Sequence, residues 1–212
     1  MIKLENVTKR IKGKTILKNV TFSINEYGIY GFIGDNGAGK TVIFKTIMGL
    51  YIPTSGDVYL NNKIISKTLE IPNNISCMIE KPEFFRDLTG IENIKLLNKI
   101  GGYNIEYNKI INLFEYFDLD KNKKVKEYSR GMIQKLAIIQ SIFEDKKIII
   151  LDEPFEYIDK TCREKLKKYL EKERNNKVIL VSSHNEADFI DISKKIFFIE
   201  KGEILYEKDF KR

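Results

Sequence analysis

One glycine-rich stretch constrains the fold of this chain more than any other feature, Gly34 to Thr41 with the sequence GDNGAGKT. It matches the pattern Gly-x-x-x-x-Gly-Lys-Thr, whose backbone N–H groups cradle the phosphates of a nucleotide. Residues 28–33 before it indicate a short buried strand, and residues 42–50 after it carry apolar side chains at helical spacing. This context predicts a helix whose N-terminus adds partial positive charge to the loop. The candidate nucleotide-binding residues are Gly34, Asp35, Asn36, Gly37, Ala38, Gly39, Lys40, Thr41 and Val42.

Lys40 and Thr41 supply the side-chain chemistry that a bound triphosphate needs. The lysine can reach the terminal phosphates, and the threonine hydroxyl can ligate Mg²⁺. A glycine-rich turn without a ligand is the alternative, and the complete pattern between a strand and a helix argues against it. We therefore expect a nucleoside triphosphate such as ATP, together with Mg²⁺.

Length and composition narrow the class of protein. A chain of 212 residues suits one large domain, or a core with one sub-domain. No apolar run approaches the roughly 20 residues that cross a bilayer, and the first residues lack the apolar stretch of a signal peptide. The net charge is +7, but the lysines at 165–172 alternate with glutamates at helical spacing, which is typical of a solvated helix face. With no interleaving of aromatic and basic residues, we expect no nucleic-acid partner, and the few cysteines favour the cytoplasm.

The remaining pattern indicates an α/β core interrupted by helices. Residues 1–25 alternate around a turn at 12–14, which predicts antiparallel strands. Further strands are expected at 57–60, 63–65, 75–79, 147–151, 178–182, 196–199 and 203–206, and helices at 90–100, 105–117, 128–143, 161–173 and 186–192. We expect a single domain, 1–212, in which 86–143 is a helical sub-domain and 1–85 with 144–212 forms the core.

Two acidic residues follow an apolar run in the second half of the chain. Residues 148–151 read as a buried parallel strand, and Asp152 and Glu153 come directly after it. Because open α/β sheets bind ligands at the carboxyl ends of their strands, both carboxylates are expected near the phosphate loop. Asp152 is suited to hold Mg²⁺, and Glu153 is suited to polarise an attacking water. A surface turn with two acidic residues is the alternative.

His184 and the segment 129–131 offer further polar groups. His184 follows the expected strand 178–182, where its imidazole could hydrogen-bond a γ-phosphate or orient water. It could equally be an ordinary surface or core histidine. Ser129 and Gly131 open a helix, and such a start is either an anion-binding device or a simple cap.

These features, in this order, resemble the nucleotide-binding domain of ABC transporters over essentially the whole chain. The resemblance implies an α/β fold, a P-loop NTPase core with an antiparallel β subdomain and a helical insert. The phosphate loop matches the Walker A motif, residues 148–153 match Walker B, and residues 128–132 match the signature motif. His184 matches the switch histidine, and Asp159 matches the aspartate of the D-loop, although an acid there could simply cap a helix.

For function, the resemblance implies an ATPase that drives a separate membrane permease from the inner face of the cell membrane. Lys40, Glu153 and His184 would be catalytic, and Ser129 and Gly131 would contact the nucleotide of a partner in a head-to-tail homodimer, or in a pair with another ABC subunit, formed on ATP binding. The region of roughly 80–115 would dock the permease, with Phe84 and Phe85 as candidate contacts. The alternative is that these two residues belong to the buried core.

Three positions depart from the family pattern. The signature is Tyr-Ser-Arg-Gly-Met instead of Leu-Ser-Gly-Gly-Gln, and Ile11 stands at the position that we align with the adenine-stacking aromatic. Glu80 replaces the usual glutamine of the regulatory loop and becomes a candidate metal ligand beside Thr41 and Asp152. The stretch 79–93 looks like the glutamate-loop version of exporters that protect bacteria against bacitracin and lantibiotics. This similarity implies export of an antimicrobial peptide, an antibiotic or a lipid-like substrate.

Two other functional classes are compatible with a phosphate loop. A soluble or regulatory ABC-type clamp would use the same site without a permease, and cell fractionation separates it from a transporter subunit. A small-molecule kinase would need an acceptor pocket and a lid, whereas Glu153 and His184 favour water as the acceptor.

Overall fold

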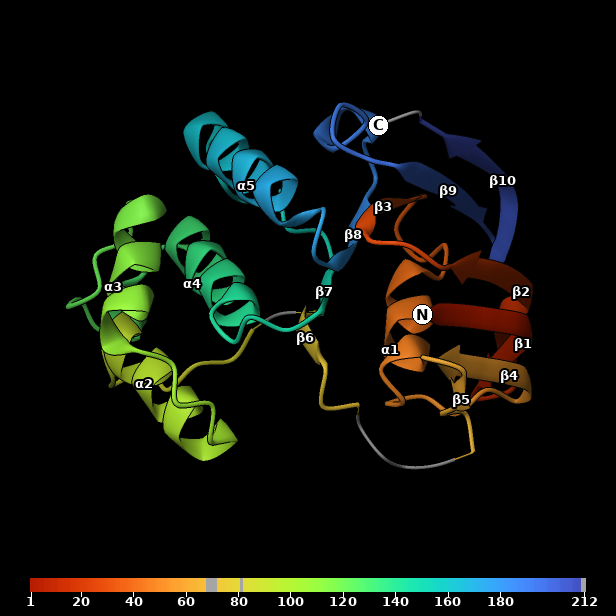
Figure 1. Cartoon of the computed structure of the whole chain (residues 1–212), viewed down its shortest axis with the longest axis horizontal. Coiled ribbons are helices and arrows are strands. Elements are labelled where there is room, and N and C mark those ends of the chain that lie inside the picture. Colours follow the sequence, from red (N-terminus) through yellow and green to blue (C-terminus); the bar gives the residue numbers. More distant parts are fainter. Residues whose placement is uncertain (68–71, 81, 211–212) are drawn as a thin grey trace.

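Two sheets and a group of helices make up the computed structural model, which describes residues 1–67, 72–80 and 82–210 (Figure 1). Lys81, within the predicted regulatory loop, lies outside the described residues. The described helices include none that combines the length and the apolar character needed to cross a membrane.

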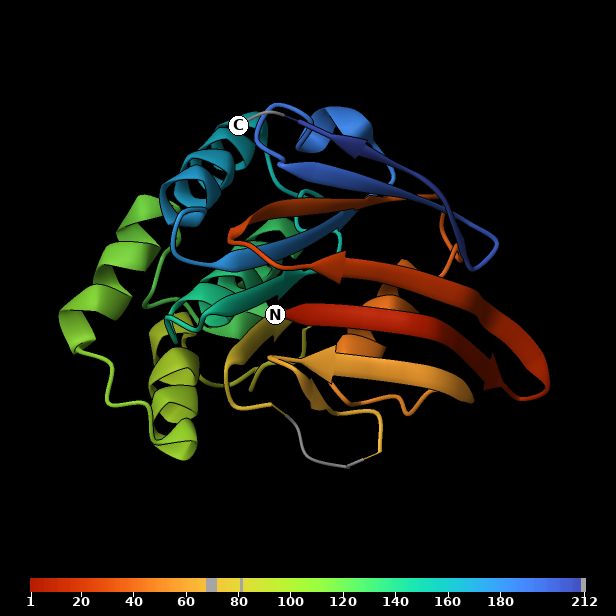
Figure 2. The same ribbon diagram turned by 45° about the vertical axis from the view of Figure 1, so that its right-hand side comes forward.

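The smaller sheet is antiparallel and lies at the N-terminal end of the chain (Figure 2). Its order is β2-β1-β4-β5, with β1 (Ile2–Ile11), β2 (Lys14–Ile24), β4 (Ser55–Leu60) and β5 (Lys63–Ile64). Alternating burial along β1 and β2 turns one face of this sheet toward the core, as the period-2 pattern predicts. The predicted hairpin around 12–14 is therefore confirmed.

The larger sheet carries the functional groups. Its order is β10-β9-β3-β8-β7-β6, and β3, β8, β7 and β6 are mutually parallel. Three of these strands, β3, β7 and β8, are buried at every residue, which fits burial on both faces of the sheet. The strands are β3 (Gly28–Ile33), β6 (Ile75–Met78), β7 (Ile148–Leu151), β8 (Val178–Ser183), β9 (Lys195–Glu200) and β10 (Glu203–Asp209). The α/β fold with a mixed set of sheets is as predicted.

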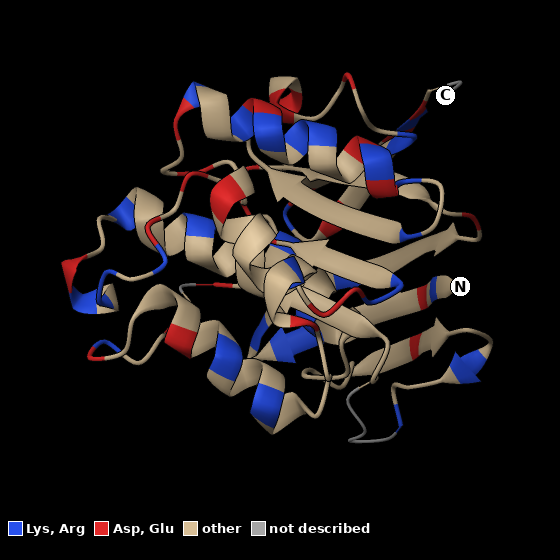
Figure 3. Ribbon diagram, turned by 60° about the vertical axis from the view of Figure 1, so that its left-hand side comes forward, with Lys and Arg blue, Asp and Glu red and all other residues tan. Residues whose placement is uncertain are grey.

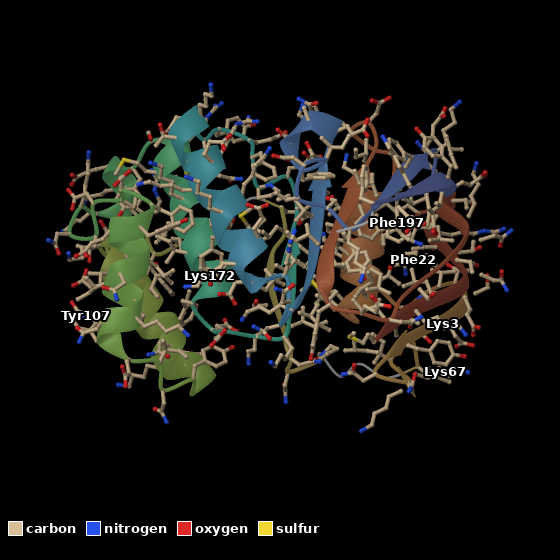
Figure 4. The ribbon with its side chains drawn as sticks, turned by 45° about the horizontal axis from the view of Figure 1, so that its top comes forward. Lys3, Phe22, Lys67, Tyr107, Lys172 and Phe197 are labelled. Carbon is tan, nitrogen blue, oxygen red and sulfur yellow. The ribbon has the colours of Figure 1, made fainter. Side chains whose placement is uncertain are left out.

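An aromatic cluster between the two sheets fixes the helix that follows the phosphate loop. Phe44 of α1 (Lys40–Ile47) meets Phe32 of β3 edge to face, with ring centroids 5.1 Å apart. Phe197 lies 4.9 Å from Phe32 and 4.8 Å from Phe22 by the same measure. Figure 4 shows Phe22 and Phe197 among the strands, far from Tyr107 on the helical side. This packing holds the start of α1 at the carboxyl end of β3.

The other helices cover the opposite side of the larger sheet. Residues 90–142 contribute helices at the left of Figure 1, and α4 packs against β6 and β7. Thr89 closes a capping box with Glu92 at the start of the first of them, as its sequence predicts. The helices are α2 (Gly90–Gly101), α3 (Tyr107–Tyr116), α4 (Arg130–Ile142) and α5 (Lys160–Glu173), with 3₁₀ turns at Val125–Glu127 and Glu186–Asp188.

Two predicted helices are shorter in the structure than the sequence indicated. The helix expected over 42–50 ends at Ile47, because Gly49 adopts a left-handed φ of 73°, and Leu50 is 46% exposed instead of buried. The helix expected over 186–192 is a single 3₁₀ turn. There, side-chain caps compete with the helical backbone, since Asn185 accepts the Ala187 N–H through its side chain.

Candidate functional site

Four neighbouring strand ends bring the predicted residues together. In the sheet order β3-β8-β7-β6, each parallel strand ends at the same edge. Gly34 follows β3, His184 follows β8, Asp152 follows β7, and Glu80 comes two residues after β6. Residues that are as much as 150 positions apart in sequence (34 and 184) therefore share one edge. This is the location at which open α/β sheets bind their ligands.

The phosphate loop exposes a row of backbone donors. Gly39, the last residue before α1, has a φ of 113°, a conformation that L side chains rarely adopt. Within the described part of the chain, the N–H groups of Gly37, Gly39, Lys40 and Thr41 donate to no backbone carbonyl. Unpaired amides at a helix N-terminus form an anion-binding site. The loop is therefore shaped for a chain of phosphates.

Lys40 is held inside this loop by oxygen atoms. Its side chain is 6% exposed, and Nζ donates to the carbonyl oxygens of Gly34 at 2.5 Å and Asp35 at 3.2 Å. Nζ also lies 3.0 Å from Glu153 Oε1 as an ion pair. The angles of this contact are not those of a hydrogen bond. Glu153 Oε1 is therefore buried without a hydrogen-bond partner. A buried ammonium and an incompletely paired carboxylate oxygen are both available to a charged ligand.

Thr41 and Asp152 form the direct link between the loop and β7. The Thr41 hydroxyl donates to Asp152 Oδ2 at 2.6 Å, and the Ser182 hydroxyl donates to Oδ1 at 2.5 Å. Burial raises the pKa of Asp152, these two hydrogen bonds oppose the increase, and the nearby charge of Glu153 adds to it. A buried carboxylate whose charge is disfavoured gains most from a cation. Thr41 and Asp152 are therefore the residues that would hold a divalent ion at this position.

Glu153 is held in a strained backbone conformation. Its φ is 50°, in the left-handed region that residues with a side chain avoid. The Glu153 N–H donates to Ser182 Oγ at 2.8 Å, and its carbonyl accepts from Gln134 Nε2 at 3.1 Å. Such strain persists where surrounding contacts enforce it, and it is frequent at functional sites. The result is a carboxylate with Oε1 toward Lys40 and Oε2 3.5 Å from Nδ1 of His184.

The cavity beside the loop has a volume of about 260 Å³. It is lined by residues 35–37 and 39–42 of the loop and by Glu153 and Ile16. Ile11, which the sequence analysis aligned with the adenine position, does not line this cavity, whereas Ile16 of the neighbouring strand does. Between the pairs Lys9–Leu17 and Arg10–Thr15 the register of β1 and β2 shifts by one residue. The resulting bulge places Ile16 at the cavity.

Gly34 and Ala38 support the loop without lining this cavity. The Gly34 N–H donates to the Ser183 carbonyl at 3.4 Å, and the Ala38 carbonyl accepts from Gly202 at 2.9 Å. They connect the loop to β8 and to the turn between β9 and β10, respectively.

Glu80 lines a second, larger cavity of about 710 Å³ together with Asn36, Asp152 and Glu153. Its carboxylate forms an ion pair with Lys45 of α1, and this contact raises the pKa of Lys45. Glu80 itself is 62% exposed in its side chain. The structure therefore brings Glu80 to the same edge as Asp152 but pairs its charge with a lysine.

Ser129 and Gly131 line neither of these two cavities. Ser129 caps α4 by accepting the Met132 N–H at 3.3 Å. At Gly131 a Cβ would lie 2.7 Å from the carbonyl oxygen of Tyr157, so this close approach requires glycine. Asp159 caps α5 by accepting the Cys162 N–H at 2.8 Å. None of these three residues contacts the phosphate loop of the same chain through the interactions described here.

Two side chains that hold the backbone of Glu153 were not identified by the sequence analysis. Ser182 bridges Asp152 and the Glu153 N–H, and Gln134 holds the Glu153 carbonyl. Ser182 is the last residue of the predicted strand 178–182, whose position had already pointed to His184. The same pattern could therefore have identified Ser182. Gln134 is buried within α4, and a polar residue among the apolar residues of a helix carries no such signal.

A family model described as "ABC transporter" matches residues 17–156 of this chain. The chain is 31% identical to the lantibiotic transport ATP-binding protein SrtF of Streptococcus pyogenes, over 99% of this chain and 91% of that protein. It is 30% identical to the bacitracin transport ATP-binding protein BcrA of Enterococcus faecalis, over 98% of this chain and 68% of the other.

The fold is also that of a solved structure, a dimeric post-hydrolysis state of the ATP-binding cassette MJ0796 bound to ADP and Pi. The TM-score is 0.89 with all of both chains covered, at 24% sequence identity. This likeness agrees with the order of strands and the helical insert described above.

Proposed function

The chain belongs to the ABC transporter family, and from that premise we propose that it drives a separate membrane permease that exports an antimicrobial peptide, an antibiotic or a lipid-like substrate. ATP is the nucleotide of this family, whose members hydrolyse it. The proposal that the chain hydrolyses ATP rests on one observation. Two contacts link the loop residues Lys40 and Thr41 to the acidic residues after β7: Thr41 hydrogen-bonds to Asp152, and Lys40 forms an ion pair with Glu153.

In this proposal, Lys40 exchanges its contacts with the carbonyls of residues 34 and 35 for phosphate oxygens. Its departure from Glu153 leaves that carboxylate free to accept a proton from an attacking water. His184, beside Oε2 of Glu153, is placed to orient the water and to hydrogen-bond the γ-phosphate. Ser129 and Gly131 of a second subunit would complete the site in a head-to-tail pair, in which closure moves the permease.

Thr41 and Asp152 would hold Mg²⁺, directly or through water, and Glu80 would join them if it leaves Lys45. When bound, Mg²⁺ supplies positive charge that neutralises the phosphate oxygens. The fit rests on the buried, charge-disfavoured carboxylate of Asp152 and on the unpaired amides of the loop.

Removing Mg²⁺ with EDTA should reduce the ATPase rate of the purified chain at least about 100-fold, because charge neutralisation and nucleotide positioning are lost together. Steady-state phosphate release measures the rate. Excess Mg²⁺ added back to the same sample should restore it. Hydrolysis that continues unchanged in EDTA would exclude the metal role of Thr41 and Asp152.

Export of an antimicrobial compound is supported by the two relatives, whose names assign them to lantibiotic and bacitracin transport. Docking of a permease is supported by a groove of about 410 Å³ at the junction of the regulatory loop and the helices. Pro82, Phe84, Arg86, Val125 and Tyr128 are among its lining residues. A helix from a cytoplasmic loop of the permease would occupy it and hold this subunit at the inner face of the membrane.

Phe85 is the strongest candidate for an anchoring side chain beside this groove. It is 60% exposed, whereas Phe84 packs against the helical core. Asn93 holds the Phe85 backbone by accepting its N–H at 2.9 Å and donating to its carbonyl at 3.1 Å. A large apolar side chain on a fixed backbone is typical of an interface hot spot.

Phe85→Ala should weaken membrane association at least about 10-fold without changing the ATPase rate of the isolated chain. The measurement is co-sedimentation with vesicles that contain the multi-span membrane protein under test as the permease. Tyr206→Ala removes another exposed aromatic side chain, 55% exposed on β10, and should leave binding unchanged. Equal binding by wild type and both variants would contradict docking at Phe85. No association by the wild type would favour a soluble or regulatory clamp.

A further inference from the structure

A buried chain of hydrogen bonds leads from the residue before His184 to helix α5. Ser183 is 1% exposed, and its hydroxyl donates to Asp188 Oδ2 at 2.5 Å. Asp188 Oδ1 in turn accepts from Arg163 Nη1 at 2.7 Å. The Asp188 side chain is 9% exposed, and Arg163 is the cation with which it forms an ion pair.

The hydroxyl of Ser183 also holds Asn185, the residue that follows His184 in the sequence. It accepts the N–H of Asn185 at 3.0 Å, so one oxygen holds the residues on both sides of the histidine. The Ser183 carbonyl accepts the N–H of Gly34, which begins the phosphate loop. His184 itself is exposed, and it lies in a segment whose neighbours are held to the loop and to Asp188. A change at Asp188 therefore reaches the imidazole through a single serine.

Arg163 connects the same network to the segment that follows Glu153. It lies in the first turn of α5, and its N–H donates to the carbonyl of Asp159, the capping residue. Its Nε also approaches the Ile158 carbonyl at 3.5 Å. One guanidinium therefore touches both the end of the segment 154–159 and the buried carboxylate of Asp188.

A second contact holds α5 to the loop after His184 without entering this network. Lys167 donates to the Ala187 carbonyl at 3.2 Å and pairs with Asp191 at 2.9 Å. Figure 3 shows positively and negatively charged residues along the ribbon of α5. Because Lys167 already fastens the helix to the loop, the contact of Arg163 with Asp188 is not needed merely to attach it.

We infer that Arg163 and Asp188 are positioning residues that set the imidazole of His184 relative to Glu153, and that they couple His184 to movement of the segment 154–159. The inference rests on the proposed hydrolytic role of Glu153 and His184. Neither residue lines the cavity beside the phosphate loop. Each acts through Ser183, and losing either one should loosen the histidine while leaving the phosphate loop intact.

His184 is the only histidine in the chain, so its imidazole gives a single, assignable signal in a carbon–proton NMR spectrum. The experiment compares that signal, and kcat and KM for ATP, in wild type, Arg163→Gln, Asp188→Asn and Arg163→Lys. Lys165→Gln is the matched control, since it breaks an ion pair of the same helix with Asp118 on another face. Circular dichroism and thermal melting establish that each variant is folded.

We expect Arg163→Gln and Asp188→Asn to shift and broaden the imidazole signal and to lower kcat about 10- to 100-fold, because small displacements of a reacting group have large effects on rate. KM should stay within about twofold, since nucleotide binding is untouched. Arg163→Lys keeps the charge without the planar fork and should restore part of the rate. Lys165→Gln should match the wild type in every measurement.

An imidazole signal that is unchanged in both folded variants would overturn the inference, whatever the rate. A large rise in KM with kcat unchanged would overturn it as well, because it would indicate a general effect on nucleotide binding. A wild-type chain that fails to hydrolyse ATP would instead refute the proposed function, and the NMR comparison would still report whether Arg163 and Asp188 position His184.

Discussion

Glu153→Gln should slow ATP hydrolysis at least about 100-fold while ATP binding is retained. The amide cannot accept a proton from water, but it keeps the shape of the side chain. It also removes the negative charge that lies 3.0 Å from Lys40 and next to the phosphate loop, so binding of an anionic ligand should not weaken. ATP that is bound but not hydrolysed should hold two subunits together.

Single-turnover hydrolysis and size-exclusion chromatography with Mg²⁺ and ATP measure these two effects. Glu171→Gln, an exposed carboxylate of α5, serves as the control and should behave as the wild type. If turnover by Glu153→Gln equals that of the wild type, Glu153 is not the general base. A monomer under conditions in which the variant is saturated with ATP would contradict the head-to-tail pair.

Lys40→Ala should remove measurable ATP binding, with the dissociation constant raised at least about 100-fold. The substitution deletes the only ammonium inside the loop among the described residues and leaves Glu153 without its counter-charge. A buried carboxylate facing the phosphates would then repel them, so the loss should exceed that of one hydrogen bond. The fold should survive, because the aromatic packing of Phe44 and Phe32 that holds α1 does not involve Lys40.

Isothermal titration with ATP and Mg²⁺ gives the dissociation constants directly. Lys168→Ala, which removes an exposed lysine of α5, controls for the general loss of positive charge. Micromolar binding by Lys40→Ala would be incompatible with a phosphate site built around this lysine.

The residues that meet at the edge of the larger sheet could be predicted from the sequence, because their positions follow from a simple rule. Apolar runs at 28–33, 148–151 and 178–182 indicate buried parallel strands, and parallel strands end at one edge. Gly34, Asp152 and His184 follow three such runs, so their proximity could be expected without knowing any contact.

The missing parts of the site depend on geometry that no local pattern encodes. Ile16 reaches the cavity through a β-bulge, which shifts the register by one residue and which the sequence does not locate. The left-handed backbone of Glu153 is imposed by Ser182 and Gln134, which come from two other elements. Similarly, the end of α1 at Ile47 and the short turn at 186–188 are decided by a glycine conformation and by side-chain caps.

The central claim is that Lys40, Thr41, Asp152 and Glu153 form one site for a magnesium-bound triphosphate. A crystal structure of Glu153→Gln grown with ATP and excess Mg²⁺ tests it most directly. We expect the triphosphate within residues 34–41, Mg²⁺ ligated by the Thr41 hydroxyl, and the Asp152 carboxylate bound to that metal ion or to one of its waters. A triphosphate bound elsewhere, or a metal ion beyond the reach of both Thr41 and Asp152, would contradict the claim.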